Sequence, residues 1–294
     1  MAAATRRSVP AALASPLIDI GANLTSSKLK HTADLLERAA QAGVSHIIVT
    51  GTSLAESEHA IRLCRAFAGA GRRPRLYCTV GCHPHEATRH AATLDAVIAR
   101  FRKLIDDNRD VVVAVGECGL DYDRNFSTPS DQKAVLAAQL DLSIACDLPL
   151  FLHARGDAHD DLCSAFGQRS WRGVVHCYTD DDRAHLQRYL SYGFSIGITG
   201  WVCDERPGRG KALQDIISEI PIDRLLIETD APYLIPRNIP KGDLHPRPKQ
   251  NEPALLSYVA RKVAECYQAF TADDIALHTT RNAKALFCLA DADD

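Results

Sequence analysis

The stretch VVVAVG (residues 111–116) decides the fold, because it is an apolar run of strand length that ends on an acid, Glu117. Three other apolar runs also end on a residue that can bind a metal or move a proton: residues 149–152 before His153, 173–175 before His176, and 224–229 before Asp230. In a closed parallel β/α barrel all strands point the same way, so residues just past their C-terminal ends surround one mouth, where barrel enzymes carry their catalytic groups. The repeated pattern therefore predicts a barrel with its functional site at that mouth.

Eight short β-branched or apolar runs occur along the chain, at residues 17–20, 47–50, 76–80, 111–115, 148–152, 173–175, 194–198 and 225–227. Amphipathic stretches separate them and carry helix-start signals. Ser53-x-x-Glu56 is typical of a capping box, and Thr128-Pro129 is typical of an N-cap and first helical residue. Eight strand–helix units predict an α/β fold, a (β/α)8 TIM barrel, with an open doubly wound sheet as the alternative.

Length and composition indicate the domain organisation. A TIM barrel takes about 250 residues as one domain, so a chain of 294 residues accommodates one barrel, which we expect over residues 17–289. Residues 1–16 contain Arg6 and Arg7, no acidic residue and many alanines. We expect a flexible N-terminal extension there, with an export or transit signal as the alternative.

Composition, charge and cysteine content indicate which kinds of partner and which cellular compartment to expect. Hydrophobic residues make up 46% and charged residues 24% of the chain, a mix typical of globular proteins, and no apolar run approaches the roughly 20 residues needed to cross a bilayer. The net charge of −3 requires any polyanion to bind through a local patch. The ten cysteines form no C-x-x-C pair, so we expect reduced thiols in the cytoplasm. We also expect a monomer without membrane contacts.

The four residues that follow the apolar runs suit metal-assisted hydrolysis. Glu117, His153 and His176 form a ligand set for a divalent cation that keeps open positions, and Asp230 is a carboxylate that can accept a proton from water. A single histidine beside an apolar run is more often a core or surface residue. The same position on four separate runs favours a shared site over that reading.

The surrounding loops carry further candidate groups. His83 and His85 follow the third run and could bind a phosphate, protonate a leaving group or complete a metal site, and Arg155 follows His153 by two residues. Cations interleaved with aromatic residues occur elsewhere in these loops: Arg124, Arg206, Arg209, Lys211, Arg237, Lys241, Arg247 and Lys249 with Tyr122, Phe126, Tyr178, Trp201 and Tyr233. Such a rim suits a single nucleic-acid strand, whose phosphates attract cations and whose bases stack on flat side chains. Ordinary solvated loops are the alternative.

Longer motifs resemble a known family. DIGANLTSS (19–27), GCHPHEA (81–87), VGECGLDYDRNFSTPSDQ (115–132), ITGWVCDERPG (198–208) and LLIETDAPYLIPR (225–237) closely resemble the TatD group of metal-dependent deoxyribonucleases, and the resemblance extends over residues 17–287. It implies an amidohydrolase-like TIM barrel with magnesium-supported nuclease activity, usually 3′–5′ exonuclease action on single-stranded DNA. It also implies that Glu117, His153 and His176 bind the metal, that Asp230 is the essential carboxylate, and that His83 is the catalytic loop histidine.

One departure from the broader family affects the metal site. That family opens with His-x-His after the first strand, whereas this chain has Gly21 and Asn23 at those positions. Two ligands are therefore missing, which predicts one tightly held cation per chain and puts a full two-metal site in doubt. Mg²⁺ is the expected ion, with Mn²⁺ or Zn²⁺ as alternatives, and the amide of Asn23 could orient a phosphate or a water.

We therefore expect a metal-dependent deoxyribonuclease with Asp230 and His83 as catalytic residues and with single-stranded DNA as its partner. Asn23, His85 and Arg155 are expected to contact the substrate. One alternative is an amidohydrolase-type enzyme acting on a small ester or amide, which would need a closed apolar pocket. Another is a nucleic-acid-binding protein without catalysis, which would have no reason to retain the metal ligands.

Overall fold

Eight strands form one parallel sheet whose spatial order follows the sequence. They are seen in a computed structural model that describes residues 8–69, 73–124, 126–246 and 248–290. The strands are β1 Leu17–Ala22, β2 Val44–Val49, β3 Arg75–Val80, β4 Val112–Asp121, β5 Leu150–Arg155, β6 Gly173–Val175, β7 Ser195–Ile198 and β8 Leu225–Ile227. A parallel bridge between Ala22 at the end of β1 and Ala231, four residues after β8, brings the first strand beside the segment that follows the last. The predicted (β/α)8 barrel is confirmed.

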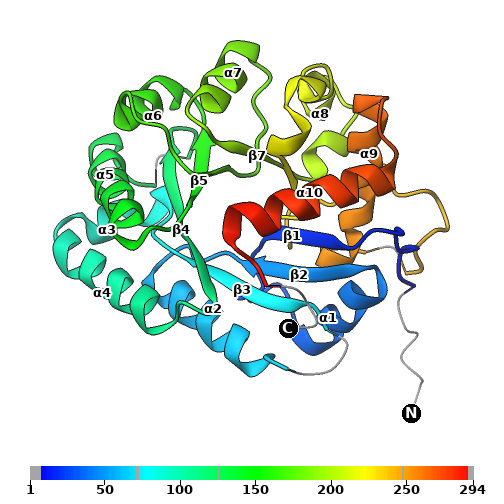
Figure 1. The fold of residues 1–294 in the computed structure, drawn as a ribbon, viewed down its shortest axis with the longest axis horizontal. Helices are drawn as coiled ribbons and strands as arrows, with labels where there is room; N and C mark the ends of the chain where they lie inside the picture. Colours follow the sequence, from blue (N-terminus) through cyan, green and yellow to red (C-terminus); the bar gives the residue numbers. More distant parts are fainter. Residues whose placement is uncertain (1–7, 70–72, 125, 247, 291–294) are drawn as a thin grey trace.

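Helices alternate with the strands and surround them (Figure 1). They are α1 Thr32–Gln41, α2 Leu54–Ala66, α3 Ala87–Ala91, α4 Leu94–Asp107, α5 Pro129–Cys146, α6 His159–Phe166, α7 Arg183–Ser191, α8 Gly210–Gln214, α9 Leu256–Tyr267 and α10 Ala272–Phe287. Short 3₁₀ turns occur in several loops. The two predicted helix starts are confirmed, because the Ser53 hydroxyl accepts the N–H of Glu56 at 3.2 Å and the Thr128 hydroxyl accepts the N–H of Asp131 at 3.1 Å.

Apolar side chains fill the barrel and its N-terminal end. One cluster joins residues of the strands to the end of α10: Ile18, Ile20, Ile48, Tyr77, Val113, Phe151, Val174, Leu226, Phe287 and Leu289. The carbonyl oxygen of Ala290 lies 3.0 Å from Nε2 of His46 on β2. The end of α10 therefore closes the N-terminal opening, and the opposite mouth, formed by the strand C-termini, carries the polar groups described below.

Strand β4 is longer than its apolar run predicts. It continues to Asp121, so Glu117 lies inside the strand, and His153 likewise lies inside β5. The prediction that both residues follow strand ends was wrong in this detail. The β4–β5 pairing shifts register between Gly116 and Cys118, and such a bulge lets a strand turn a side chain without ending its pairing. Here the bulged residue is Glu117.

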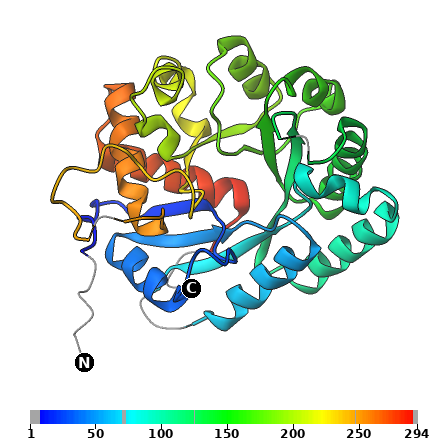
Figure 2. The same cartoon turned by 180° about the vertical axis from the view of Figure 1, so that it is seen from behind.

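The start of the described chain lies beside the loop after β8. The N–H of Ser8 donates to the carbonyl of His245 at 3.1 Å, and the N–H of Ala14 donates to Oδ1 of Asp273 at 2.5 Å. Figures 1 and 2 show this dark-blue segment next to the gold loop at one edge of the barrel. The predicted extension covers residues 1–7, which lie outside the described residues, and residues 8–16, which have these contacts. Its flexibility stays a prediction.

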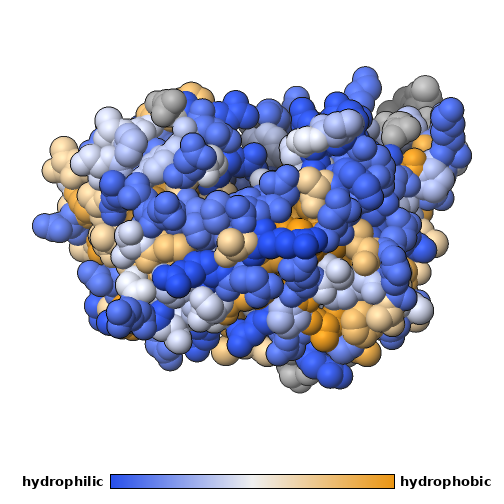
Figure 3. Space-filling view, turned by 90° about the horizontal axis from the view of Figure 1, so that it is seen from above, coloured by the Kyte–Doolittle hydropathy of each residue, from blue (hydrophilic) through white to orange (hydrophobic). Residues whose placement is uncertain are grey.

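The cysteines, the helices and the surface can be compared with what the composition predicts. All ten cysteines are free, and most are buried, although Cys288 is exposed. None of the helices in the described ranges is long and apolar enough to span a bilayer. The face shown in Figure 3 is mostly hydrophilic, with hydrophobic residues scattered over it.

Candidate metal and catalytic site

Glu117 is the centre of a cluster of three imidazoles. Its Oε1 atom lies 2.8 Å from Nδ1 of His153, 2.8 Å from Nε2 of His176 and 3.2 Å from Nε2 of His83. The four residues come from β4, β5 and the ends of β6 and β3, so the barrel brings together side chains that are up to 93 positions apart (176 − 83). The convergence expected from the sequence is present for all four.

Burial and charge set the protonation of this cluster. Burial would raise the pKa of Glu117, but the positive charge of His176 and the hydrogen bonds from His153 and His176 hold that pKa well below its usual value. Burial opposes a charge on His176, yet Glu117 and Glu228 raise the pKa of His176 well above its usual value. Without a metal, Glu117 and His176 therefore form a buried ion pair.

The donor set fits a divalent cation. One donor atom from each of His83, Glu117 and His153 lies within 4.8 Å of the other two, and His176 contacts the same oxygen of Glu117. Nε2 of His153 is buried without a hydrogen-bond partner, although Oδ2 of Asp121 lies 3.4 Å away. Carboxylate and imidazole groups are ligands for divalent ions, and a buried nitrogen without a hydrogen bond is stabilised by such a partner.

His83 differs from the other two histidines in its protonation. The N–H of His85 donates to Nδ1 of His83 at 3.1 Å, so Nδ1 carries no proton. Burial lowers the pKa of His83 to about 4 despite the nearby Glu117. At neutral pH the ring is therefore uncharged, with its single proton on the Nε2 atom that faces Glu117. That atom is a hydrogen-bond donor, which suits contact with an anionic oxygen better than metal ligation.

Asp230 follows β8 and faces the same cluster. Its backbone has φ 53°, and its Oδ1 atom accepts a hydrogen bond from Nδ2 of Asn23 at 2.9 Å. Burial raises the pKa of Asp230 to about 7; the positive charge of His176 opposes this, and the negative charges of Glu117 and Glu228 add to it. Asn23, expected to contact substrate, thus contacts the candidate base.

His85 and Arg155, also expected to contact substrate, lie on the rim of the cluster. Nε2 of His85 lies 2.6 Å from Oδ2 of Asp121, and Nη2 of Arg155 lies 3.8 Å from the sulfur of Cys177. Asp121 is 1% exposed, and its Oδ1 accepts the N–H of Asp123 at 2.9 Å. Sequence reasoning missed Asp121, although it stands in the motif quoted for the family, because the β4 strand was expected to end at residue 115.

Glu228 is the second residue that sequence reasoning missed. It is fully buried, its carboxylate accepts the N–H of Cys177, and it lies 3.4 Å from Nδ1 of His176. A Cβ atom on Gly21 would lie 2.1 Å from Oε2 of Glu228, and one on Gly197 would lie 2.7 Å from Oε1. Gly21, which replaces a histidine of the broader family, therefore leaves the space that Glu228 fills. The glycine at position 21, where the broader family has a metal-binding histidine, was the sequence feature that could have indicated a neighbouring side chain such as Glu228.

The predicted cationic rim is only partly assembled. Arg206, Arg209, Arg237 and Trp201 line one cavity between the loops after β7 and β8. Phe126 and Tyr233 are exposed, at 66% and 47%, and the ammonium of Lys28 lies 4.7 Å from the centre of the Tyr233 ring. Arg247 lies outside the described residues.

Sequence comparisons with known proteins match nearly the whole chain to one family. The family described as TatD related DNase matches residues 18–288. A protein of Erwinia amylovora named 3′-5′ ssDNA/RNA exonuclease TatD is 41% identical over 283 residues, which cover 93% of this chain and all of its own. A protein of the same name from Musicola paradisiaca is 45% identical over 258 residues, or 84% of this chain and 89% of its own.

Solved structures give the same result. The crystal structure of a TatD family hydrolase from Entamoeba histolytica superposes with a TM-score of 0.80 and 26% identity, covering 94% of this chain and 99% of its own. That of a TatD homologue from Escherichia coli superposes with a TM-score of 0.79 and 27% identity, covering 93% and 98%. By sequence and by fold, the chain belongs to the TatD related DNase family.

Proposed function

We propose that this protein is a metal-dependent deoxyribonuclease that removes nucleotides from the 3′ end of single-stranded DNA. The observation that carries the proposal is the buried Glu117 carboxylate surrounded by three imidazoles, with Asp230 beside them. The names of the relatives from Erwinia amylovora and Musicola paradisiaca support the substrate and the direction. The ten free thiols support a cytoplasmic location, and we propose a monomer.

Glu117, His153 and His176 would hold the cation. A divalent cation at this position supplies Lewis-acid polarisation of the phosphodiester and lowers the pKa of water. We propose Mg²⁺ because it binds through few protein groups together with substrate phosphates. Imidazole nitrogens also suit Mn²⁺ and Zn²⁺, so the metal-free protein should be titrated with each ion in turn.

Asp230 would accept the proton of the attacking water. A pKa near the working pH is the best compromise for a general base, and burial gives Asp230 a pKa of about 7. The amide of Asn23 donates to Oδ1 of Asp230, and the Cys177 thiol donates weakly to Oδ2 at 3.9 Å, which leaves a lone pair of Oδ2 for water. The Nε2–H of His83 would donate to a phosphate oxygen, and Arg155 and His85 would contact the neighbouring phosphates from the rim.

The test is hydrolysis of a single strand labelled at its 5′ end, with metal and after chelation. The wild-type protein should give a ladder that shortens by single nucleotides, and Glu117→Gln and His153→Ala should each lose at least about 100-fold in kcat/KM, since a catalytic metal contributes several kcal/mol. His185→Gln is the matched control, because His185 on α7 pairs with Asp180 at 2.7 Å outside this cluster. Wild-type rates in chelator, or a fully active His153→Ala protein, would contradict the proposal.

A further inference from the structure

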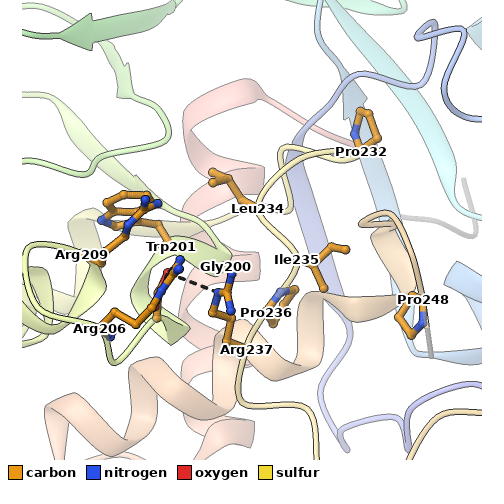
Figure 4. A pocket seen from close by; sticks show the side chains of 11 residues that line it. Gly200, Trp201, Arg206, Arg209, Pro232, Leu234, Ile235, Pro236, Arg237 and Pro248 are labelled. Carbon is orange, nitrogen blue, oxygen red and sulfur yellow. Dashed lines mark hydrogen bonds and ion pairs between the residues drawn. The ribbon is translucent and has the colours of Figure 1, made fainter.

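A cavity of about 420 Å³ lies between the loops after β7 and β8. Figure 4 shows side chains around it, including Trp201, Arg206, Arg209, Leu234, Pro236 and Arg237. The two loops meet at Gly200, where a Cβ atom would lie 2.1 Å from the carbonyl oxygen of Leu234. Pro232, which also lines the cavity, follows Asp230 by two residues. The cavity, here called the β7–β8 pocket, is thus continuous in sequence with the proposed catalytic carboxylate.

One buried carboxylate orients two of the three guanidinium groups. Oδ1 of Asp204 accepts Nε of Arg206 at 2.8 Å, and its Oδ2 accepts Nη2 of Arg206 at 2.6 Å and lies 3.3 Å from Nε of Arg237. The side chain of Asp204 is 6% exposed, whereas those of Arg206 and Arg237 are 51% and 57% exposed. The pocket therefore presents fixed cations towards solvent.

The third cation covers an aromatic ring. The guanidinium carbon of Arg209 lies 5.1 Å from the centre of the Trp201 ring, and among the described residues no carboxylate forms an ion pair with Arg209. With Arg206 and Arg237, three cations face one carboxylate, which leaves two positive charges on the pocket. Leu234, Ile235 and Pro236 supply an apolar wall across from Arg206 and Arg209, and Arg237 lies next to Pro236 (Figure 4).

This combination fits one nucleotide better than a simple anion. A phosphate requires the cations but not a tryptophan or an apolar wall, whereas an unstacked base needs flat and apolar surfaces. The volume lies in the range of small-molecule pockets, about 300–1,000 Å³. Loops after strands 7 and 8 also form a recurrent phosphate site in TIM barrels.

We propose that the β7–β8 pocket is a subsite for one nucleotide of the DNA strand next to the cleaved phosphodiester. Its phosphate contacts Arg206 and Arg237, and its base packs against the Trp201–Arg209 pair. The proposal rests on the proposed nuclease function and adds the residues that hold the strand beyond the bond being cut. It predicts that the pocket contributes only when the substrate is longer than one nucleotide.

The first experiment compares two substrates: a single-stranded oligonucleotide of about ten nucleotides and the p-nitrophenyl ester of thymidine 5′-monophosphate, which lacks the neighbouring nucleotide that the pocket is proposed to hold. Arg206→Gln with Arg237→Gln should lower kcat/KM for the oligonucleotide by about tenfold or more, because two charge-assisted phosphate contacts are lost. The ester should change by less than about twofold, since it makes neither contact. Adding Asp204→Asn, which removes the carboxylate left without partners, should preserve this difference.

The matched control is Arg100→Gln with Arg102→Gln on α4. These arginines are also ion-paired and have similar side-chain exposures, 59% and 56%, so the net charge falls equally at a distant surface. If the pocket variant loses the same activity on both substrates, or loses no more than the control on the oligonucleotide, the subsite is wrong. If the wild-type protein hydrolyses neither substrate with any divalent metal, the proposed function itself fails.

The second experiment tests directly whether a base of the DNA strand lies against Trp201. The chain has two tryptophans, so Trp171→Phe leaves Trp201 as the single fluorophore and Trp201→Phe leaves Trp171, which precedes β6 on the N-terminal side of the barrel. Oligonucleotide added in chelator, with binding followed by anisotropy of a labelled strand, should quench Trp201 and leave Trp171 unchanged. Trp201→Leu should weaken binding by about tenfold, the effect of losing one stacked base. Binding without quenching of Trp201 would overturn the proposal.

Discussion

At the scale of single residues, metal and protons compete for the same nitrogen atoms. The pKa of His176 is raised well above its usual value and that of His153 is also raised, in both cases against burial, because carboxylates face them. The metal-free protein therefore holds protons through neutral pH that ligation must displace. Metal affinity should therefore rise with pH and keep rising above the usual imidazole pKa of about 6.5, because the raised pKa values of His153 and His176 extend proton competition to higher pH.

Calorimetry in two buffers with different ionisation enthalpies measures this proton release. We expect between one and two protons released per metal at neutral pH, and fewer in a His176→Gln variant. If metal uptake releases no protons and the affinity is independent of pH, neither His153 nor His176 is a ligand.

His83 gives a second prediction at this scale. Its unprotonated Nδ1 and donating Nε2 suit a phosphate oxygen, so His83→Ala should lower kcat by about 100–1,000-fold, the usual value of one transition-state hydrogen bond. Metal affinity should fall by no more than about 10–100-fold, the usual cost of losing a group that orients a ligand, because Nε2 of His83 contacts Glu117 but no ligand is lost. His83→Gln keeps an N–H donor and should recover part of the rate. Loss of metal binding in both variants would identify His83 as a ligand instead.

The third prediction at this scale concerns the packing of Gly21 against Glu228. A Cβ atom at residue 21 would lie 2.1 Å from Oε2 of Glu228, so Gly21→Ala should destabilise the fold by about 1–3 kcal/mol, the typical cost of overpacking. In Glu228→Ala the space is free, and the double variant should be more stable than the two single effects predict when added. Urea unfolding of the four proteins measures this coupling. Strictly additive effects would refute the proposed clash between a side chain at residue 21 and Glu228. The same clash would oppose a Gly21→His substitution.

Strand β4 determines the site at the scale of secondary-structure elements. Gly116 has φ 143°, and a Cβ atom on it would lie 2.3 Å from the carbonyl oxygen of Phe151 on β5. Gly116→Ala should therefore cost at least about 3 kcal/mol, because it combines backbone strain with a clash inside a central strand pair. Gly208→Ala is the control: φ is 66°, but no atom lies within 4 Å, so only the smaller strain of about 1 kcal/mol remains. Urea midpoints compare them, and equal losses would contradict this role of the close β4–β5 approach.

The same strand shows what the sequence could and could not predict. The apolar runs indicated eight strands, and the chemistry at their ends indicated Glu117, His153, His176 and Asp230, because alternation of strands with amphipathic helices is a local pattern. The continuation of β4 to Asp121 depends on pairing with β5 across a bulge, which is a tertiary contact. Asp121 was therefore missed, and so was Glu228, whose burial depends on glycines of β1 and β7.

At the scale of the whole molecule, the residues that stabilise the fold and the residues proposed for catalysis lie at different ends of the barrel. Helix α10 closes the N-terminal end, and the polar groups lie at the C-terminal end. Phe287 is 2% exposed within the interior cluster, so Phe287→Ala should lower the free energy of unfolding by about 3–5 kcal/mol. Leu277 lies on the same helix at 45% exposure, and Leu277→Ala should cost under about 1 kcal/mol. Both variants, assayed where they remain folded, should keep kcat within about twofold of wild type, since no contact at the mouth is changed. Urea unfolding and kinetics on one preparation measure the two quantities together. A large loss of kcat in folded Phe287→Ala protein would mean that packing at the closed end also positions the catalytic groups through the barrel interior, where Phe151 contacts the His176 ring at a centroid distance of 4.5 Å.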